Sequence, residues 1–403
     1  MRQLLMTLKS MVPAVWTIIV GQFLINLAFY SIYPFLALYL LRNHVSTAVI
    51  GSILGARTLA NMLGTVVGGW WANRTPSRRV MSLGFFGTGM GYFIMAATTS
   101  SLMAIGGLFA ASFFSGVAYP AESKAILENT TPNNRTEIYS ALRMVINLAG
   151  GVAPLLALAF FLPMPRFSFG VFAGITITYG LSALRWIPSR VGESRVSQSR
   201  SGSYRAVLRN QSFMWTLLSL TLSSMAYSLL VTLLPLFMSS MFPVHGHKLY
   251  AIILWVNTIM VIFLQLPTTA FSRRIGQRAS LILGQSLYFV SLVAVGFAGA
   301  FSEILAAFAL FTVGEMLISP SGFALLTRNI PTEQSATYMA IAQLRNGFAQ
   351  SACSFVGGLI LQVNGGRSMV FSFAGYAFFA VAFSLLPVLL ARAHTGPQQP
   401  IDR

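Results

Sequence analysis

Twelve long apolar segments, separated by short loops, occupy almost all of this 403-residue sequence. They lie at 13–41, 47–72, 79–99, 103–122, 138–163, 168–188, 213–242, 249–272, 279–299, 303–326, 336–362 and 369–392. A helix needs about 20 apolar residues to cross a bilayer core of roughly 30 Å, and every segment reaches about that length. The pattern therefore predicts an all-α membrane protein with twelve transmembrane helices.

The composition supports helices rather than a barrel. Hydrophobic residues make up 55% of the chain and charged residues 8%. Only helices or closed barrels satisfy their backbone groups inside hydrocarbon, and long continuous apolar runs differ from the alternating pattern of barrel strands. The first segment follows Arg2 and Lys9 as a secretory signal would, but it continues for nearly 30 residues without a convincing cleavage pattern. We interpret it as a retained span.

The basic residues are distributed unevenly between the two sets of loops. With the spans above, only Arg42, Arg166, Lys248 and Arg367 fall opposite the N-terminus. We count with the N-terminal side the arginines that lie in spans towards that side, which are Arg79, Arg143, Arg185, Arg345 and Arg392, so that Arg57 alone is assigned to the inside of the membrane. The positive-inside rule then places both termini in the cytoplasm. We attribute the net charge of +18 to loops that face anionic lipid headgroups, and we expect no nucleic-acid partner.

Few residues carry chemistry of other kinds. The single cysteine, Cys353, excludes an internal disulfide, and the four histidines form no metal-binding pattern. The sequence contains neither a spaced set of catalytic residues nor a glycine-rich phosphate loop. We expect no metal, no cofactor and no enzymatic activity. A membrane-embedded enzyme and a non-transporting receptor remain disfavoured alternatives, and a receptor would show saturable binding without flux.

Landmarks in the two halves recur at one offset, which indicates an internal repeat. The pairs, 200 to 202 residues apart, are Arg74 and Arg274, Pro120 and Pro320, and Arg143 and Arg345. We predict an N-terminal six-helix bundle at 1–188, a basic cytoplasmic linker at 189–211, a C-terminal six-helix bundle at 212–393 and a cytoplasmic tail at 394–403. Secondary transporters use such repeats and bind substrate between them.

Besides Glu303, at the outer boundary of the tenth span, two of the eight acidic residues fall in or at the end of a span. Glu122 comes at the cytoplasmic end of the fourth, and Glu315 lies roughly 18 Å into the tenth. A mid-membrane carboxylate costs about 2 to 3.5 kcal/mol, so it is a functional candidate by default. We predict that Glu315, Arg57 and Glu122 carry proton coupling. Arg57, about 15 Å deep, would attract Glu315; a static buried pair, or a hydrogen bond from protonated Glu315 to the backbone, is the alternative.

The loop at 69–79 resembles the signature G-x-x-x-D-R-x-G-R-R of the major facilitator superfamily, and the resemblance extends over nearly the full chain. Asn73 replaces the usual aspartate, and Pro76 and Ser77 replace the glycine with one extra residue. The resemblance implies a cytoplasmic latch loop formed by Gly69, Asn73, Arg74, Arg78, Arg79, Arg274 and Gly276. Without its carboxylate the latch would be weaker or differently partnered. Arginines that merely enforce topology are the alternative.

The tenth span resembles the G-E-x-x-x-x-P stretch of the 12-span drug:proton antiporter branch, through Gly314, Glu315 and Pro320. Two departures from that branch are the shortened fifth-span motif at 150–154 and Ser112 where an arginine is often found. The resemblance implies two pseudo-symmetric six-helix bundles around a central cavity. The peptide-importer branch shows a similar tenth span, but its first-span cluster of acids and arginine is absent.

In that family eight of the spans surround the cavity, and this chain places polar residues on several of them. We predict cavity residues at Gln22, Asn26, Tyr30, Tyr33, Asn257 and Gln265. The first three are spaced by four and share one helical face, Tyr33 precedes a break at Pro34, and Asn257 and Gln265 again share a face. These side chains either contact cargo or hold helices together.

We therefore expect a monomeric secondary transporter in the bacterial inner membrane, which exchanges protons for small amphipathic molecules such as drugs or short peptides, as multidrug efflux proteins do. Its partners would be the small-molecule substrate, protons and the lipid bilayer. A proton-coupled importer or a uniporter of a small polar metabolite is the alternative, and transport driven by an imposed pH gradient would distinguish them.

Overall fold

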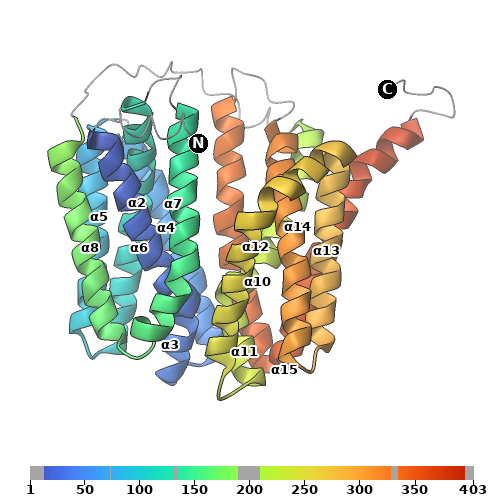
Figure 1. Cartoon of the computed structure of the whole chain (residues 1–403), viewed down its shortest axis with the longest axis horizontal. Helices are drawn as coiled ribbons and strands as arrows, with labels where there is room; N and C mark the ends of the chain where they lie inside the picture. Colours follow the sequence, from blue (N-terminus) through green and yellow to red (C-terminus); the bar gives the residue numbers. More distant parts are fainter. Residues whose placement is uncertain (1–12, 73, 131–134, 189–208, 328–334, 395–403) are drawn as a thin grey trace. The chain divides into compact units, whose positions relative to one another are not determined.

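The computed structural model describes residues 13–72, 74–130, 135–188, 209–327 and 335–394, and their regular structure is entirely helical (Figure 1). The first half contains α2 (Pro13–Ile32), η1 (Tyr33–Phe35), α3 (Leu36–Arg42), α4 (Thr47–Ala72), α5 (Ser77–Ala97), α6 (Ser101–Glu128), α7 (Arg135–Leu156), the π-helical turn η2 (Ala157–Phe161) and α8 (Pro165–Trp186). The second contains α10 (Gln211–Thr232), α11 (Leu234–Met241), α12 (Gly246–Ile275), α13 (Gln277–Phe297), α14 (Phe301–Thr327) and α15 (Ser335–His394).

All twelve predicted apolar segments fall on these helices, so the predicted fold class is confirmed. Eleven helical stretches in the described part are long and apolar enough to cross a membrane. The last of them, Leu344–Leu386, has 43 residues and covers most of both the eleventh and the twelfth predicted segments. Gly365, at φ 82° and ψ 173°, interrupts helical geometry between the two. Only glycine adopts such angles at little cost. The non-helical backbone at Gly365 divides α15 into two spans.

Proline explains the break in the first span. Pro34 fixes its own φ and has no N–H to donate, so α2 ends at Ile32, a 3₁₀ turn follows and α3 resumes at Leu36. The seventh span repeats this design, because α10 ends at Thr232 and α11 begins at Leu234 with Pro235 in its first turn. The break that the sequence predicted at Pro34 is confirmed.

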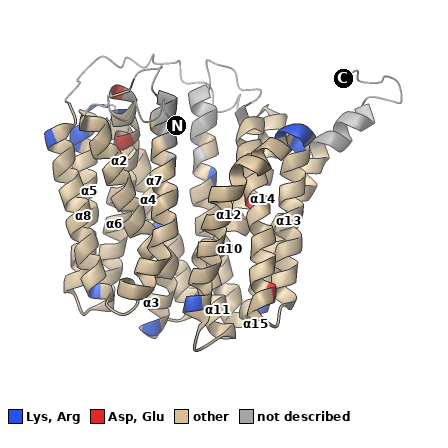
Figure 2. Cartoon of the chain, in the orientation of Figure 1, with Lys and Arg blue, Asp and Glu red and all other residues tan. Residues whose placement is uncertain are grey.

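Large apolar side chains cover the outside of the helices. Leu266 and Phe263 on α12 are 80% and 72% exposed, which water would penalise and lipid does not. Charged residues gather near the ends of the helices, whereas their middles carry almost none (Figure 2). The chain is therefore a multi-pass membrane protein.

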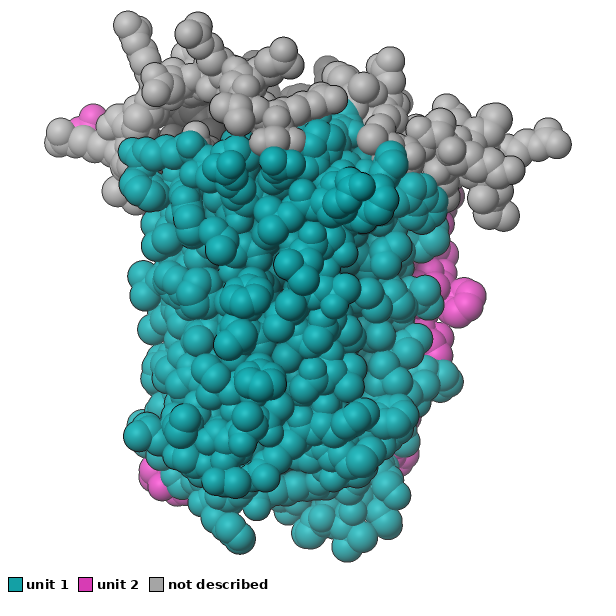
Figure 3. Space-filling view, turned by 90° about the vertical axis from the view of Figure 1, so that its left-hand side faces the viewer, with its two compact units in different colours: residues 1–197, 231–258, 354–359 teal, residues 198–230, 259–353, 360–403 magenta. Residues whose placement is uncertain are grey.

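Contacts group the chain into two compact units (Figure 3). The first comprises Met1–Ser197, Val231–Thr258 and Ser354–Leu359, and the second comprises Gln198–Leu230, Ile259–Cys353 and Ile360–Arg403. Within the first unit α5 packs on α6 and α8, α4 on α6, and α2 on α7 and α8; within the second, α13 packs on α14. The predicted domain boundaries stay a prediction, and most of the predicted linker lies outside the described residues.

A seam of glycines brings α4 and α6 together. Gly64 and Gly68 on α4 face the backbone carbonyls of Phe113 and Val117, and Gly116 on α6 faces the carbonyl of Asn61. A Cβ atom at any of these glycines would overlap a main-chain oxygen. Small residues allow this approach, which supplies packing energy where no hydrophobic effect acts between helices. Gly64 and Gly68 are four residues apart and so lie on one face of α4.

The second unit has a polar cluster in its core, centred on Gln285 of α13. Its Nε2 donates to Ser219 Oγ at 2.7 Å and to Ser223 Oγ at 2.9 Å, and Ser219 Oγ lies 2.6 Å from Ser384 Oγ. The cluster joins α10, α13 and α15 through neutral side chains only. Nearby on α14, Gly322 packs directly against the side chain of Leu220.

Candidate functional site

Glu122 is a buried carboxyl group in the core of the first unit. The sequence placed it at the end of the fourth span, but α6 continues through Glu128, so Glu122 lies inside the helical span. Only 3% of its surface is exposed. Its neighbours on the same helix, Ala118, Ala121 and Ala125, belong to the apolar core of this unit. The small alanines leave room for side chains from other helices to reach the carboxyl group.

Two donors from two other helices hold the carboxyl group. Gln22 Nε2 of α2 donates to Glu122 Oε2 at 2.5 Å, and Tyr179 Oη of α8 donates to Glu122 Oε1. Asn26 Nδ2 donates to Gln22 Oε1 at 2.7 Å, which fixes the amide so that its NH₂ group faces Glu122. Hydrogen bonds to an ionised carboxylate are the stronger kind, so this arrangement stabilises a charge that the apolar core disfavours.

The packing of Tyr179 explains how its hydroxyl reaches Glu122. A Cβ atom on Gly21 of α2 would overlap the Tyr179 ring, so the glycine creates the space in which that ring lies. On its other side the ring packs against Phe85, with 4.6 Å between the centroids. The phenol is therefore held in one position, with its oxygen against the carboxyl group.

This arrangement provides partners for both protonation states of Glu122. When the carboxyl group is ionised, Tyr179 and Gln22 both donate to it. When it is protonated, its O–H can donate to the phenol oxygen while Gln22 still donates to the other carboxyl oxygen. A group that keeps its partners in both states is suited to binding and releasing a proton reversibly.

Of the predicted site residues, the structure brings Gln22, Asn26 and Glu122 together. It adds Tyr179, which the sequence analysis missed. The only signal for Tyr179 was a polar hydroxyl on the apolar sixth span, and the resemblance does not place that span at the cavity. Tyr30 lies one turn beyond Asn26 on α2 and is half-buried.

Arg57 of α4 lies against aromatic rings. Its guanidinium carbon is 4.0 Å from the centroid of Tyr33 and 5.9 Å from that of Phe29, and those rings stack with 5.0 Å between centroids. The faces of the rings attract the cation. The Nε atom is buried without a hydrogen-bond partner among the described residues. Glu315 belongs to the other unit, so the predicted attraction between Arg57 and Glu315 stays a prediction.

Glu315 is half-buried on α14, beside an aromatic cluster of the second unit. Its carboxyl group lies within electrostatic range of the phenol of Tyr288 on α13. The ring of Tyr288 stacks on that of Phe311, with 3.8 Å between centroids and 3° between planes. The preceding residue, Gly314, packs against the backbone of Gly284, which allows α14 to approach α13 at this level.

The polar residues of α12 have different surroundings. Gln265 Nε2 donates to Thr269 Oγ1 at 3.2 Å and to the carbonyl oxygen of Met316 at 3.3 Å. It therefore joins α12 to α14 next to Glu315, which favours the helix-holding role of the two that the sequence left open. Asn257 is half-buried on the same helix. That Gln265 and Asn257 contact cargo stays a prediction.

The arginines of the predicted latch loop are not paired with carboxylates in the described part of the chain. Arg74 stacks on Trp70, with 4.0 Å from the guanidinium carbon to the ring centroid, and Arg79 is exposed. The Nε atom of Arg78 is buried and has no hydrogen-bond partner among the described residues. Gly69 has open space around it, and Asn73 lies outside the described residues.

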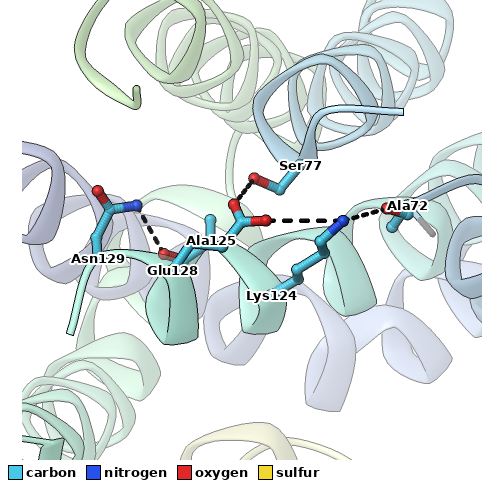
Figure 4. A network of polar contacts seen from close by, with 6 residues as sticks. All are labelled: Ala72, Ser77, Lys124, Ala125, Glu128 and Asn129. Carbon is cyan, nitrogen blue, oxygen red and sulfur yellow. Dashed lines mark hydrogen bonds and ion pairs between the residues drawn. The ribbon is translucent and has the colours of Figure 1, made fainter. Parts of the chain in front are cut away.

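A lysine and a glutamate of α6 hold the two helix ends that flank this loop (Figure 4). Lys124 Nζ donates to the carbonyl of Ala72, the last residue of α4, at 2.7 Å. Glu128 Oε2 accepts from Ser77 Oγ, in the first residue of α5, at 2.6 Å, and the two side chains form an ion pair at 3.6 Å. Asn73 stands where the family signature has an aspartate, and Glu128 of α6 places a carboxylate beside the same loop.

The corresponding loop of the second unit lies between α12 and α13. Arg274 is exposed, and Gly276 adopts φ 85° directly before α13 begins. Because a side chain is strained at such a φ, the loop needs glycine there. A cavity of about 650 Å³ adjoins the loop and is lined by Gly276, Arg278, Ala324 and Leu325 among others.

Nothing in the described part of the chain resembles a metal site, since no three His, Cys, Asp or Glu side chains come together there. Cys353 is buried on α15. The polar groups described above are the carboxyl groups of Glu122 and Glu315, together with cation–π and hydrogen-bond contacts.

Comparisons with known proteins agree with the fold. The sequence model described as Major Facilitator Superfamily matches residues 18–352 and 247–402. The uncharacterized MFS-type transporter YqjV of Bacillus subtilis (strain 168) is 24% identical over 98% of this chain and 99% of its own. A Na(+), Li(+), K(+)/H(+) antiporter of Planococcus maritimus is 19% identical over 81% of this chain and 84% of its own.

Among solved structures, a crystal structure of a mutant of the nucleoside transporter NupG superimposes with a TM-score of 0.78. The match covers 93% of this chain and 99% of that one at 16% identity. At this level of identity the likeness shows the fold and carries no information about the cargo.

Proposed function

The chain belongs to the Major Facilitator Superfamily and is a membrane transporter, and from that premise we propose that it couples proton movement to the export of small amphipathic molecules by alternating access. The resemblance to the superfamily that the loop at 69–79 indicated is thereby confirmed. Membership of the drug:proton antiporter branch is part of the proposal. It is supported by the tenth-span stretch around Glu315.

One observation carries the proposal: the carboxyl group of Glu122 is buried and held by Gln22 and Tyr179. An ionisable group is costly inside a membrane protein and is retained mainly where it works. Here its partners suit both the ionised and the protonated form. A conformational change that opens the space around Glu122 to water on one side and then on the other would load and release one proton per cycle.

We assign Glu315 a second role in the same cycle, in the other unit. Its aromatic surroundings at Tyr288 and Phe311 disfavour a charge, so the carboxyl group would be neutral in one state and ionised in another. Arg57, a cation that no described carboxylate pairs, would attract whichever acid or cargo group approaches it. The cavity residues Asn257 and Tyr30 would contact the cargo directly.

Further parts of the proposal rest on the sequence. The uneven distribution of Lys and Arg supports cytoplasmic termini, and the named bacterial relatives support the bacterial inner membrane. The monomeric state is proposed from the resemblance alone.

The test uses purified protein in liposomes with an imposed pH gradient and a panel of cationic dyes and drugs. Export predicts that the gradient drives cargo against its own gradient, in the direction opposite to proton flow. Glu122→Gln keeps the size and hydrogen-bond capacity of the side chain but does not titrate, so it should abolish gradient-driven transport. Cargo exchange without a gradient should remain.

Glu303→Gln is the control, since it removes a carboxylate that caps the start of α14 and does not contact Glu122. If the pH gradient drives transport equally well in Glu122→Gln and in the unaltered protein, Glu122 has no role in proton coupling. Movement of cargo in the same direction as protons would indicate an importer, and gradient-independent flux would indicate a uniporter.

A second candidate is exchange of a monovalent cation for protons. The observation in its favour is the relative named as a Na(+), Li(+), K(+)/H(+) antiporter, which aligns over most of both chains. The same liposomes test it, because addition of Na⁺, Li⁺ or K⁺ would then collapse the pH gradient without any organic cargo. A gradient that only drugs or dyes collapse would leave the first candidate.

A further inference from the structure

A second pocket lies in the first unit, at the end of its spans that is remote from Pro13. Its volume is about 420 Å³, and residues from three segments line it. Tyr39 and Arg42 come from the end of α3, Phe161 from the π-helical turn η2, and Arg166 and Phe167 from the start of α8. No predicted site residue lines this pocket, and the proposed transport cycle does not use it.

Two guanidinium groups give the pocket a positive charge. Arg42 Nη1 donates to the carbonyl of Leu162 at 2.9 Å, which holds this side chain at the pocket wall. Arg166 makes no hydrogen bond or ion pair within the described residues, and no described carboxylate pairs with either arginine. Both side chains are at least partly exposed. The positive charge therefore remains available to a ligand.

The backbone adds to this charge. α8 begins at Pro165, with no acidic residue in its first turn. The N–H groups at the start of a helix lack helical partners and carry the positive end of the helix dipole. Since Pro165, Arg166 and Phe167 all line the pocket, this helix start lies at the same place as the two guanidiniums. A helix N-terminus of this kind favours anions.

The π-helical turn explains the position of Arg42. Leu162 N donates to Ala157 O at 2.8 Å, a bond over five residues. The wider turn positions Leu162 so that its carbonyl oxygen accepts a hydrogen bond from Arg42. Single π-helical turns inside helices frequently occur at functional sites, and here the turn builds one wall of the pocket.

We propose that this pocket binds an anionic phosphate group that carries an organic substituent. Guanidinium groups match phosphate oxygens through paired N–H donors, and the start of α8 adds backbone donors. The pocket is larger than a phosphate ion, and Tyr39, Phe161 and Phe167 offer apolar surface to the substituent. At the end of a transmembrane bundle, phospholipid headgroups present this chemistry, and soluble organic phosphates share it.

The experiment uses the full-length protein in a nonionic detergent and measures binding by native mass spectrometry and by thermal stabilisation. The probes are phosphatidylglycerol, phosphatidylcholine and glycerol 1-phosphate. We expect phosphatidylglycerol to bind at least tenfold more tightly than zwitterionic phosphatidylcholine. The double variant Arg42→Gln with Arg166→Gln should lose at least tenfold in affinity for phosphatidylglycerol.

Arg166→Gln alone should weaken binding severalfold, and it cannot disturb folding through lost polar contacts because this side chain makes none with a described residue. Arg367→Gln is the matched control: Arg367 also donates to a backbone carbonyl, that of Ala298 at 3.4 Å, but lies outside this pocket. Displacement of the lipid by glycerol 1-phosphate would assign the site to soluble phosphates, and persistence of the lipid would assign it to headgroups. Equal binding of both lipids, or unchanged binding in the double variant, would overturn the proposal.

Discussion

Lys124 and Glu128, one turn apart on α6, place opposite charges on the facing ends of two other helices. The ammonium group lies 2.7 Å from the carbonyl of Ala72, where α4 ends, and the carboxylate lies 2.6 Å from the hydroxyl of Ser77, where α5 begins. Each charge meets the helix-dipole end of opposite sign. The pair thus fixes the short connection between α4 and α5 from the side.

The first prediction concerns this pair. Glu128→Gln should lower the stability of the detergent-solubilised protein by about 0.5 to 1.5 kcal/mol, because the neutral amide loses its attraction to Lys124 and to the start of α5. Lys124→Gln should act similarly, and the double variant should cost less than the sum of the two. Thermal inactivation at low and high salt measures this. Strictly additive losses would show that the two charges act independently.

The second prediction concerns Tyr179. Tyr179→Phe removes a partner of both forms of Glu122, but the bond to the ionised carboxylate is the stronger of the two. The variant therefore favours the protonated form, which then persists at lower proton concentrations. The pH profile of gradient-driven transport should therefore move to higher pH, by about one to two units for one hydrogen bond to a charged group. Initial rates in liposomes across a pH series measure the shift. Tyr92→Phe, which removes a phenol away from Glu122, should leave the profile in place; a shift equal in both variants would contradict the assignment.

The third prediction separates two carboxyl groups of α14. Glu315→Gln should reduce gradient-driven transport at least tenfold, while the protein still inserts and exchanges cargo. Glu303→Gln should have little effect on transport, because Glu303 accepts hydrogen bonds from the N–H groups of Gly299 and Ala300 at the helix start and acts as a cap. Its loss should have only a small effect on stability. Equal transport in the two variants would argue against a role for Glu315.

The fourth prediction concerns the glycine seam. Gly64→Val should prevent normal folding, because its side chain would overlap the carbonyl of Phe113 and force α4 away from α6, at a cost of about 1 to 3 kcal/mol or more. Gly106 on α6 has open space around it. Gly106→Ala should therefore leave the yield of monodisperse protein unchanged. Size-exclusion chromatography of fluorescent fusions measures both. A normal yield of Gly64→Val would show that α4 and α6 can move apart without loss of folded protein.

The positions of the spans could be predicted because bilayer thickness fixes the length of an apolar segment. Pro34 likewise predicted the break that follows Ile32. Each of these features depends on residues near one another in the sequence, and each is confirmed.

The surroundings of the acids could not be predicted in the same way. Glu122 meets Tyr179 across 57 positions of the sequence and Gln22 across 100, and periodicity does not indicate which helices adjoin. The apolar run stops at Glu122, so hydropathy placed it at a helix end, whereas the bonds to Gln22 and Tyr179 allow α6 to continue. Glu128 also follows the end of this apolar run, and its contact with Ser77 spans 51 positions.

The packing of Gly322 against Leu220 bears on the symmetry of the repeat. At the repeat offset of 200, Gly322 stands where the first half has Glu122, and Ser115 stands where the second half has Glu315. Each half therefore holds an acid at a position where the other half holds none, so the two halves are not interchangeable copies. Leu220 occupies the space beside Gly322, so a glutamate introduced at position 322 would not fit unless Leu220 were also replaced by a smaller residue.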